Sequence, residues 1–262
     1  MKGKLRLDQL LLARGLAPSR AKAQALIRAG RVFVDGQLRD KPGVLVPEDA
    51  EIAVKRPPRY VSRGGEKLEG ALKAFGVDPT GKVCLDVGAS TGGFTDCLLQ
   101  HGAKRVHAVD VGRGQLHFRL RGDPRVVVHE GVNARYLYFE EIGEPVDLAT
   151  VDVSFISLRL VLPPLKGIVR PEGDVIALVK PQFEAGRERV KKGGVVRDPE
   201  VHREVLRGIV AFVEGELSWS VAGAVRSPLR GPAGNVEFLL HLLPRPGSSA
   251  RLNWDGLLHP SP

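Results

Sequence analysis

The sequence GASTGGF, residues Gly88–Phe94, decides the fold of the larger part of this chain. It follows an apolar run with an acid near its end, KVCLDV (Lys82–Val87), and precedes a helical pattern, TDCLLQHG (Thr95–Gly102). Glycines allow a tight turn and a close approach to a ligand, and free N–H groups at a helix start attract polar or anionic groups. The next apolar run ends at Asp110, 22 residues after Gly88, where an acid suits a ribose diol. The pattern predicts a strand, a turn and a helix that bind a nucleotide-like cofactor.

The order of these residues resembles the first motif of S-adenosylmethionine (SAM) methyltransferases. Asp86 precedes the glycines in the spacing D-x-G-x-x-x-G-G, which differs from the G-x-G-x-x-G fingerprint of hydride-transfer cofactors. A tight turn without a ligand is the alternative. We favour a cofactor site because acids end two successive predicted strands around the loop.

Length and composition restrict the class of protein. The 262 residues allow a large domain with a small one, and 43% hydrophobic residues support a real core. The chain has no run of about 18 uncharged apolar residues, and its start lacks the apolar stretch of a signal peptide. We therefore expect a cytoplasmic protein with no membrane segment. Two cysteines, Cys84 and Cys97, make neither a disulfide framework nor a metal cluster, so no metal is expected.

The positive charge is concentrated at the amino terminus. The net charge is +9, and residues 1–60 hold 13 Lys and Arg against 6 Asp and Glu. Such an excess indicates a polyanionic partner. Two short helices, Arg6–Arg14 and Arg20–Ala29, are predicted there, with Ser19 as a helix cap. A hairpin turn at Asp35-Gly36 follows, and then a strand over Glu51–Val54.

A cationic stripe runs along the second of these helices. Arg20, Gln24, Arg28 and Arg31 recur at helical spacing, although such a stripe is most often only a solvated face. The segment RLDQLLLARGLAPSRAKAQALIRAGRVFVDGQLRDKPGVLV is similar to the S-four-type RNA-binding module named after a small-subunit ribosomal protein. The resemblance implies an RNA-binding domain over residues 1–54. Its candidate RNA contacts are Arg6, Arg20, Lys22, Arg28 and Arg31.

Paired prolines predict a basic linker over residues 55–63, before a helix that starts at Ser62 or Gly64. Arg59 and Arg63 are further candidate RNA contacts. Lys67 falls in the first turn of the helix, where the helix dipole slightly disfavours a cation. A solvent-exposed lysine is the commoner case, so this position alone is a weak sign of function.

Charged residues follow two later strands. Asp152 ends the predicted strand Asp147–Asp152, and Lys180 directly follows Asp174–Val179. Ligands bind at the carboxyl ends of parallel strands, and a buried charge is costly unless it is paired. We therefore expect Asp152 and Lys180 beside the glycine loop. Asn133, after the strand Val126–His129, either reaches an adenine edge or caps a helix.

The last third of the chain holds a basic loop, a helix and two strands. Residues 184–197 are long enough for a lid or an RNA-contacting loop, and Asp198-Pro199 opens a helix. Glu237 interrupts the final strand, Asn235–Leu243, where an acid is more often exposed at the rim. The Pro/Gly/Ser-rich tail, residues 244–262, is expected to be poorly ordered. The candidate RNA contacts of the loop are Arg187, Arg189, Lys191 and Lys192.

Residues 55–243 resemble the FtsJ-like ribose 2′-O-methyltransferases through VSRGGEKL, LDVGASTGGFTDCLL, AVDVGRGQL, DLATVDVSFISL, LVKPQFE and NVEFLL. With the amino-terminal module, the whole chain resembles the TlyA family of rRNA 2′-O-methyltransferases, often named haemolysins. This resemblance implies a Rossmann-like, seven-stranded α/β methyltransferase domain over 64–243 and a small α+β RNA-binding domain. It also implies transfer of a methyl group from SAM to a cytidine ribose in 16S or 23S rRNA.

The resemblance assigns residues to two functions. The family's catalytic tetrad falls on Lys67, Asp152, Lys180 and Glu237. Lys180 then acts as the acceptor of the 2′-OH proton or, if it stays protonated, as a stabiliser of the forming alkoxide. The implied cofactor-binding residues are Asp86, Gly88, Ala89, Ser90, Thr91, Gly92, Gly93, Phe94, Asp110, Val111, Asn133 and Asp152.

Three other functions stay open at this point. A base or protein methylase is one, although amino-group methylases usually carry a D/N-P-P-Y/F loop where this chain has Asp152-Val153-Ser154-Phe155. A membrane-lytic haemolysin would need an amphipathic or spanning segment, and the sequence shows none. A ribosome-assembly factor that binds RNA without catalysis is the third.

Overall fold

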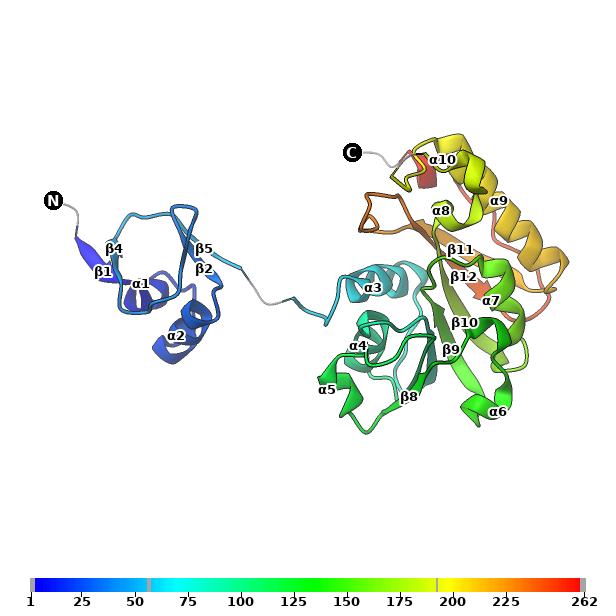
Figure 1. Cartoon of the computed structure of the whole chain (residues 1–262), viewed down its shortest axis with the longest axis horizontal. Coiled ribbons are helices and arrows are strands. Elements are labelled where there is room, and N and C mark those ends of the chain that lie inside the picture. The colour runs from blue at the N-terminus through cyan, green and yellow to red at the C-terminus, as the bar shows by residue number, and fades with distance from the viewer. Residues whose placement is uncertain (1–2, 56–57, 192, 260–262) are drawn as a thin grey trace. The chain divides into compact units, whose positions relative to one another are not determined.

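The structure is a computed structural model that describes residues 3–55, 58–191 and 193–259. The chain divides into two compact units, Met1–Pro58 and Arg59–Pro262 (Figure 1). Each unit has its own apolar core: residues such as Leu7 and Ile27 form the first, and strand and helix residues from Tyr60 onward form the second.

The amino-terminal unit is a small α+β domain. Ser19 caps the second helix by accepting a hydrogen bond from the Lys22 backbone N–H at 3.2 Å. Asp35 and Gly36 both have positive φ, which the hairpin turn requires. One difference from the expected pattern is at Arg6, which ends a strand instead of starting a helix, because Leu5 pairs with Val46. The elements are β1 (Lys4–Arg6), α1 (Leu7–Ala13), α2 (Arg20–Arg28), β2 (Val32–Val34), β3 (Gln37–Arg39), β4 (Leu45–Pro47) and β5 (Ile52–Val54).

The larger unit is built on one seven-stranded sheet, as predicted. Its strand order is β11-β12-β10-β9-β6-β7-β8, and β12 is antiparallel to both of its neighbours. β6, β7, β8, β9 and β10 are parallel to one another. The strands are β6 (Val83–Val87), β7 (Arg105–Asp110), β8 (Val126–Glu130), β9 (Val146–Val151), β10 (Val169–Val179), β11 (Ser220–Arg226) and β12 (Phe238–Leu243).

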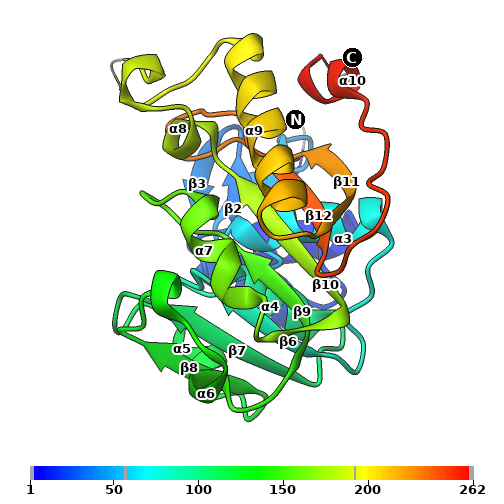
Figure 2. The ribbon, with the colours of Figure 1, turned by 90° about the vertical axis from the view of Figure 1, so that its right-hand side faces the viewer.

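Helices cover both faces of this sheet, as Figures 1 and 2 show together. α3 (Gly64–Phe75) and α4 (Gly93–Gln100) pack on one face, with Leu68 and Leu98 fully buried. α7 (Leu158–Leu165) and α9 (Pro199–Gly215) pack on the other, around Leu162 and Leu206. The shorter helices are α5 (Phe118–Arg121), η1 (Ala134–Tyr136), α6 (Phe139–Ile142), α8 (Pro181–Glu184), η2 (Arg187–Arg189) and α10 (Trp254–Leu258).

The carboxy-terminal segment differs from the poorly ordered tail that we expected. Its last helix, α10, packs against α9 and β11. Leu257 and Leu258 are 8% and 7% exposed, and Arg203 forms an ion pair with Asp255 at 2.9 Å. The composition of the tail is that of a linker, but its two leucines bury apolar area against the sheet domain, which opposes the entropy of ordering.

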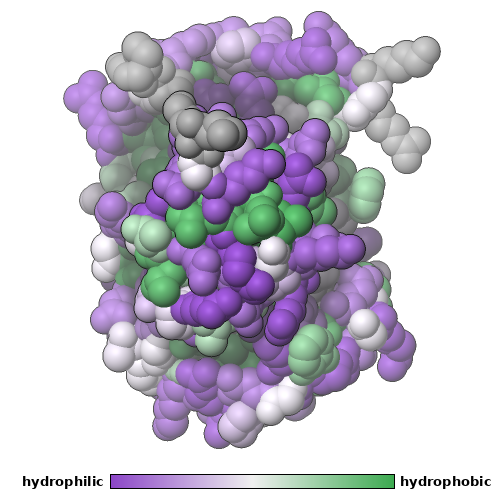
Figure 3. All heavy atoms as spheres, turned by 90° about the vertical axis from the view of Figure 1, so that its left-hand side faces the viewer, coloured by the Kyte–Doolittle hydropathy of each residue, from purple (hydrophilic) through white to green (hydrophobic). Residues whose placement is uncertain are grey.

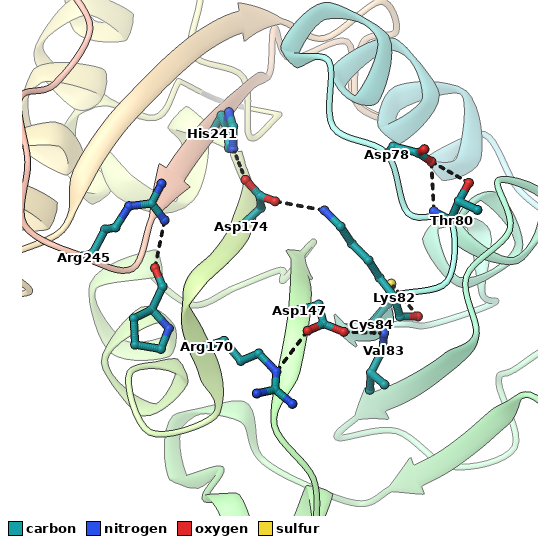
Figure 4. A network of polar contacts seen from close by, with 11 residues as sticks. Asp78, Thr80, Lys82, Val83, Cys84, Asp147, Arg170, Asp174, His241 and Arg245 are labelled. Carbon is teal, nitrogen blue, oxygen red and sulfur yellow. Dashed lines mark hydrogen bonds and ion pairs between the residues drawn. The ribbon is translucent and has the colours of Figure 1, made fainter.

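A network of polar contacts closes the amino ends of the central strands (Figure 4). Asp174 on β10 accepts hydrogen bonds from Lys82 Nζ at 3.1 Å and His241 Nε2 at 2.8 Å. Asp147 on β9 accepts from the Val83 backbone N–H at 2.9 Å and pairs with Arg170. These contacts join neighbouring strands near the edge of the sheet opposite the glycine loop.

Candidate active site

The glycine loop lies where the strand order of the sheet reverses. β6 has β7 on one side and β9 on the other, and Val87 pairs with Val151. Gly88 and Asp152 therefore leave the sheet side by side at the carboxyl edge, which is where open α/β sheets bind ligands. Gly88 has φ +84, and a Cβ there would lie 2.4 Å from the Asp152 carbonyl oxygen. A glycine is required at this position on both counts.

Two lysine–carboxylate pairs line a cavity of about 290 Å³ beside this loop. Lys180 Nζ lies 2.6 Å from Asp152 Oδ1, and Lys67 Nζ lies 2.5 Å from Glu237 Oε2. The antiparallel β12 makes this possible, because it begins where β10 ends. Since Val179 pairs with Phe238, the next residues, Lys180 and Glu237, emerge from the sheet together. The structure thus brings all four residues of the predicted tetrad into one cavity.

The two pairs differ in burial. The Lys67 and Glu237 side chains are 8% and 1% exposed, whereas those of Lys180 and Asp152 are 11% and 22% exposed. Glu237 is therefore buried, which corrects the expectation of an acid exposed at the rim. The charges of Lys67 and Glu237 stabilise each other, because removal of either one would leave the other buried without a partner.

A second cavity of about 450 Å³ adjoins the first and shares Gly88, Ser90, Asp152 and Ser154 with it. Asp110 lines it, and both of its carboxylate oxygens accept backbone N–H groups, from Ser90 at 2.8 Å and from Gly112 at 2.7 Å. The glycine loop and the turn after β7 thereby hold this acid in one orientation.

Two other predicted cofactor residues line the second cavity. Asn133 caps η1 by accepting the Arg135 N–H at 3.0 Å, so its capping role and its place on the cavity wall coexist. Val111, at the rim, is 70% exposed.

The other predicted cofactor residues fall into two groups. Ala89, Thr91, Gly93 and Phe94 line the first cavity. Asp86 and Gly92 line neither cavity, so their assignment as cofactor-binding residues stays a prediction. Asp86 is fully buried beneath the loop, where its carboxylate accepts hydrogen bonds from Thr95 Oγ1 at 2.7 Å and Thr150 Oγ1 at 3.2 Å. Burial raises the pKa of Asp86 to about 7.

Two residues of the site were not predicted as site residues from the sequence. Ser154 Oγ accepts a hydrogen bond from Lys180 Nζ at 2.9 Å. Phe155, on the wall of the second cavity, is 90% exposed and has φ +63, and its ring lies 4.9 Å from that of Phe183. Such an exposed aromatic in a left-handed conformation is costly to the fold. The available signal was their position two and three residues after Asp152, the acid that follows β9.

In the amino-terminal unit, a buried carboxylate organises the cationic surface. Asp8 is fully buried and forms ion pairs with Arg6 at 3.1 Å and Arg20 at 3.0 Å, while Gln24 Nε2 donates to it at 2.8 Å. The hydrogen bond from Arg6 is the main reason that the pKa of Asp8 lies well below its usual range. Part of the predicted stripe is therefore anchored to α1. Hydrophilic side chains cover most of the face drawn in Figure 3.

The remaining candidate RNA contacts have different surroundings. Lys22, Arg28 and Lys191 are exposed. Arg63 lines the first cavity. Arg59 and Arg189 form ion pairs with Glu69 and Glu204, so their charges are already matched. Arg31 is half-buried. The side chain of Arg187 is not described, and Lys192 lies outside the described residues.

The fold and the paired charges beside a glycine loop define a Rossmann-like methyltransferase, and comparison with known proteins agrees. Residues 60–243 match the family model described as FtsJ-like methyltransferase, and residues 5–52 match that of the S4 domain. The chain belongs to the FtsJ-like methyltransferase family and carries an S4 domain before the catalytic one.

Relatives resemble the chain over nearly its whole length. The Bacillus subtilis protein YqxC is 53% identical over 91% of this chain and 85% of its own. A 16S/23S rRNA (cytidine-2′-O)-methyltransferase, TlyA of Mycobacterium tuberculosis, is 50% identical over 92% of this chain and 91% of its own. A solved structure of a Streptococcus thermophilus protein, 42% identical, matches 98% of this chain and 95% of that one with a TM-score of 0.73.

Proposed function

We propose that this protein transfers a methyl group from SAM to the ribose 2′-OH of a cytidine in 16S or 23S rRNA. The observation that carries the proposal is the cavity beside the glycine loop. It holds Lys180 paired with Asp152 and Lys67 paired with Glu237. The TlyA relative, which is named for this reaction, supplies the substrate class.

The residues of the second cavity fit SAM. Asp110, with its oxygens oriented by the loop, suits a ribose diol. Asn133 Oδ1 is occupied by the helix cap, which leaves its amide N–H₂ to donate to an adenine ring. Asp86, beneath them, is a positioning residue that holds the loop through Thr95. SAM would supply an activated methyl group for in-line displacement.

Lys180 is the residue that we assign to the proton of the 2′-OH. Its Nζ donates a hydrogen bond to Ser154 Oγ at 2.9 Å and forms an ion pair with Asp152 Oδ1 at 2.6 Å. These two contacts leave one position on the nitrogen for the substrate. In the neutral amine this position is a lone pair that accepts the proton. In the ammonium form it is an N–H that stabilises the alkoxide. Asp152 orients the nitrogen in both cases.

We assign the two activities to separate parts of the chain. Residues 1–54 supply RNA affinity, residues 55–63 link the domains, and residues 64–243 carry the chemistry. No helix among the described residues is long and apolar enough to cross a membrane. Removing residues 1–54 should weaken RNA binding and flatten its salt dependence while SAM affinity stays nearly unchanged. Equal rRNA affinity of the truncated and full chains would contradict this division.

The reaction is tested by transfer of tritium from labelled SAM to ribosomal subunits that lack the modification. Reverse-transcription stops then map the methylated nucleotide. We expect a stop at a cytidine that depends on the protein and on SAM. Binding to the subunits without any transfer would instead identify a ribosome-assembly factor, and label in a base or a protein would identify a different methylase.

The cofactor site is tested separately by calorimetry with SAM. Gly88→Val should abolish SAM binding, because the new side chain would collide with the Asp152 backbone. Gly81→Ala is the matched control: Gly81 also has positive φ, at +73, but nothing lies within 4 Å of the position of a Cβ. It should keep its SAM affinity. An unchanged affinity in Gly88→Val would refute the site.

A further inference from the structure

A third cavity, of about 480 Å³, lies next to the catalytic one and is not used by the proposed reaction. Three arginines line it: Arg197 at the end of the basic loop, Arg226 at the end of β11, and Arg230 in the turn before β12. We call it the arginine cavity. Such a concentration of cations around a hollow is a suitable site for an anion.

The positive charge of this cavity is not neutralised. Among the described residues, none of the three guanidinium groups forms an ion pair with a carboxylate. Arg226 Nη1 donates to the Leu258 carbonyl at 3.5 Å and Arg230 Nη1 to the Gly234 carbonyl at 3.2 Å. These bonds to neutral oxygens orient the side chains and leave their charges available.

Two other titratable groups lie near the arginines. Asp198 uses Oδ1 to cap α9, accepting the Glu200 N–H at 2.9 Å, and it is not on the cavity wall. His202 lines the cavity, but its Nε2 lies 3.0 Å from the Val196 carbonyl and burial lowers the pKa of the ring. The arginines are therefore the source of the positive potential.

One short segment separates the arginine cavity from the catalytic cavity. Pro232 and Glu237 line the catalytic side, whereas Ala233 and Val236 line the arginine side. Asn235, 1% exposed, fixes this wall: its Nδ2 donates to the Gly194 carbonyl at 2.8 Å, and its Oδ1 accepts the Val196 N–H at 2.9 Å. The two cavities are thus adjacent and held by a common, buried hydrogen-bonded wall.

We infer that the arginine cavity binds a backbone phosphate of the RNA strand that presents its ribose to the catalytic cavity. The inference rests on the proposed function. A ribose within an RNA chain carries a phosphodiester on each side, and the 3′ one is attached to the carbon next to the reacting 2′-OH. Both lysines of the catalytic cavity are already paired with carboxylates. The three arginines of the adjacent arginine cavity supply the positive charge that binds this phosphate.

The test compares the double variant Arg197→Gln/Arg230→Gln with Arg251→Gln in the full chain. Arg197 and Arg230 are exposed, so their loss should leave the fold intact, and Arg251 is an exposed arginine that is absent from the cavity wall. Rates of tritium transfer and rRNA affinity are measured at several salt concentrations. The double variant should bind rRNA about fivefold or more weakly, with a salt slope smaller by about 1, as for one lost phosphate contact. SAM affinity should not change.

Three results would overturn the inference. The first is an rRNA affinity and salt slope of the double variant equal to those of Arg251→Gln. The second is a weakened SAM affinity with normal rRNA binding. The third comes from calorimetry with inorganic phosphate: a dissociation constant well below ~1 mM that the double variant loses would assign the cavity to a free anion. Failure of the proposed function gives a different result, because the protein without substitutions would then transfer no methyl group to rRNA.

Discussion

The two ends of the central strands carry the same kinds of charged residue but use them differently. At the amino ends, Lys82 and His241 hydrogen-bond to Asp174, and the network closes the sheet (Figure 4). At the carboxyl ends, Lys180 and Asp152 pair on the wall of a cavity. Paired charges alone therefore do not identify the active site of this protein. Their position at the open, strand-reversal edge beside the glycine loop does.

The largest expected effect is on methyl transfer, when a lysine at the carboxyl ends of the strands is replaced and one at the amino ends serves as the control. Lys180→Ala should cut methyl transfer at least ~10²-fold, the low end for losing a proton-transfer group, while SAM and RNA affinities change far less. Lys82→Ala is the matched control, since Lys82 pairs with an aspartate at the other end of the sheet. It should lower stability and leave single-turnover transfer unchanged. Near-normal transfer by Lys180→Ala would show that its assignment is wrong.

Lys180→Arg distinguishes the two roles considered for Lys180, proton acceptor and stabiliser of the alkoxide. Arginine keeps the charge but accepts no proton near neutral pH. A substantially active arginine variant, measured in single turnover, would favour stabilisation of the alkoxide and count against a base. An inactive one is compatible with the base, although the changed shape of the side chain contributes as well.

The second expected effect concerns the deeper pair. Lys67→Met leaves Glu237 charged and buried without its partner, so we expect a loss of about 3–5 kcal/mol in the free energy of unfolding, besides a loss of transfer. Lys67→Met with Glu237→Leu removes both charges and should recover most of the stability in denaturant unfolding, but not the activity. If the double variant recovered the activity too, the pair would be structural only.

Asp86 and Asp174 should contribute to stability with opposite dependence on pH. Burial raises the pKa of Asp86 in the folded protein to about 7. The stability that Asp86 contributes is therefore complete below about pH 4, where the residue is protonated, and is lost as the pH rises toward 7. Asp86→Asn should therefore gain melting temperature relative to the unmodified protein between pH 5 and 8.

Asp174 should behave in the opposite way. Burial alone would raise its pKa, but the hydrogen bonds from His241 and Lys82 and the charge of Lys82 outweigh burial and lower it. Its stabilising effect is present above about pH 4 and is lost on acidification. Asp174→Asn should thus be less stable than the unmodified protein at pH 7, with a difference that shrinks toward pH 3. Thermal melts of both variants across this range test the signs.

The smallest expected effect is at the exposed part of the amino-end network. Asp147→Asn weakens the ion pair with Arg170 and keeps an oxygen that can accept the Val83 N–H. We expect a loss of about 1 kcal/mol or less in stability, with SAM affinity and transfer unchanged. A marked loss of transfer would mean that the two ends of the sheet are coupled.

The glycine loop and the acids around it could be located from sequence because their signals are local. Gly88 stands at a turn whose backbone conformation requires it, and Asp152 and Lys180 end strands that are visible as apolar runs. Lys67 and Glu237 gave only weak signals, and they joined the site through the resemblance. Their residue types and neighbours in the chain are compatible with an ordinary solvated face or strand rim.

By itself, the sequence determined the two domains' classes of fold, the loop and the edge of the sheet where a ligand binds. Turns, caps and hydrophobic periodicity depend on neighbouring residues, so they can be read along the chain. Only the tertiary structure decided how the charges combine. The antiparallel β12 begins where β10 ends, so Glu237 meets Lys67 across 170 positions of sequence. Asn235 hydrogen-bonds to Gly194 and Val196 in the wall that separates the catalytic cavity from the arginine cavity. Burial and pairing of charge arise between distant segments, and no local pattern encodes them.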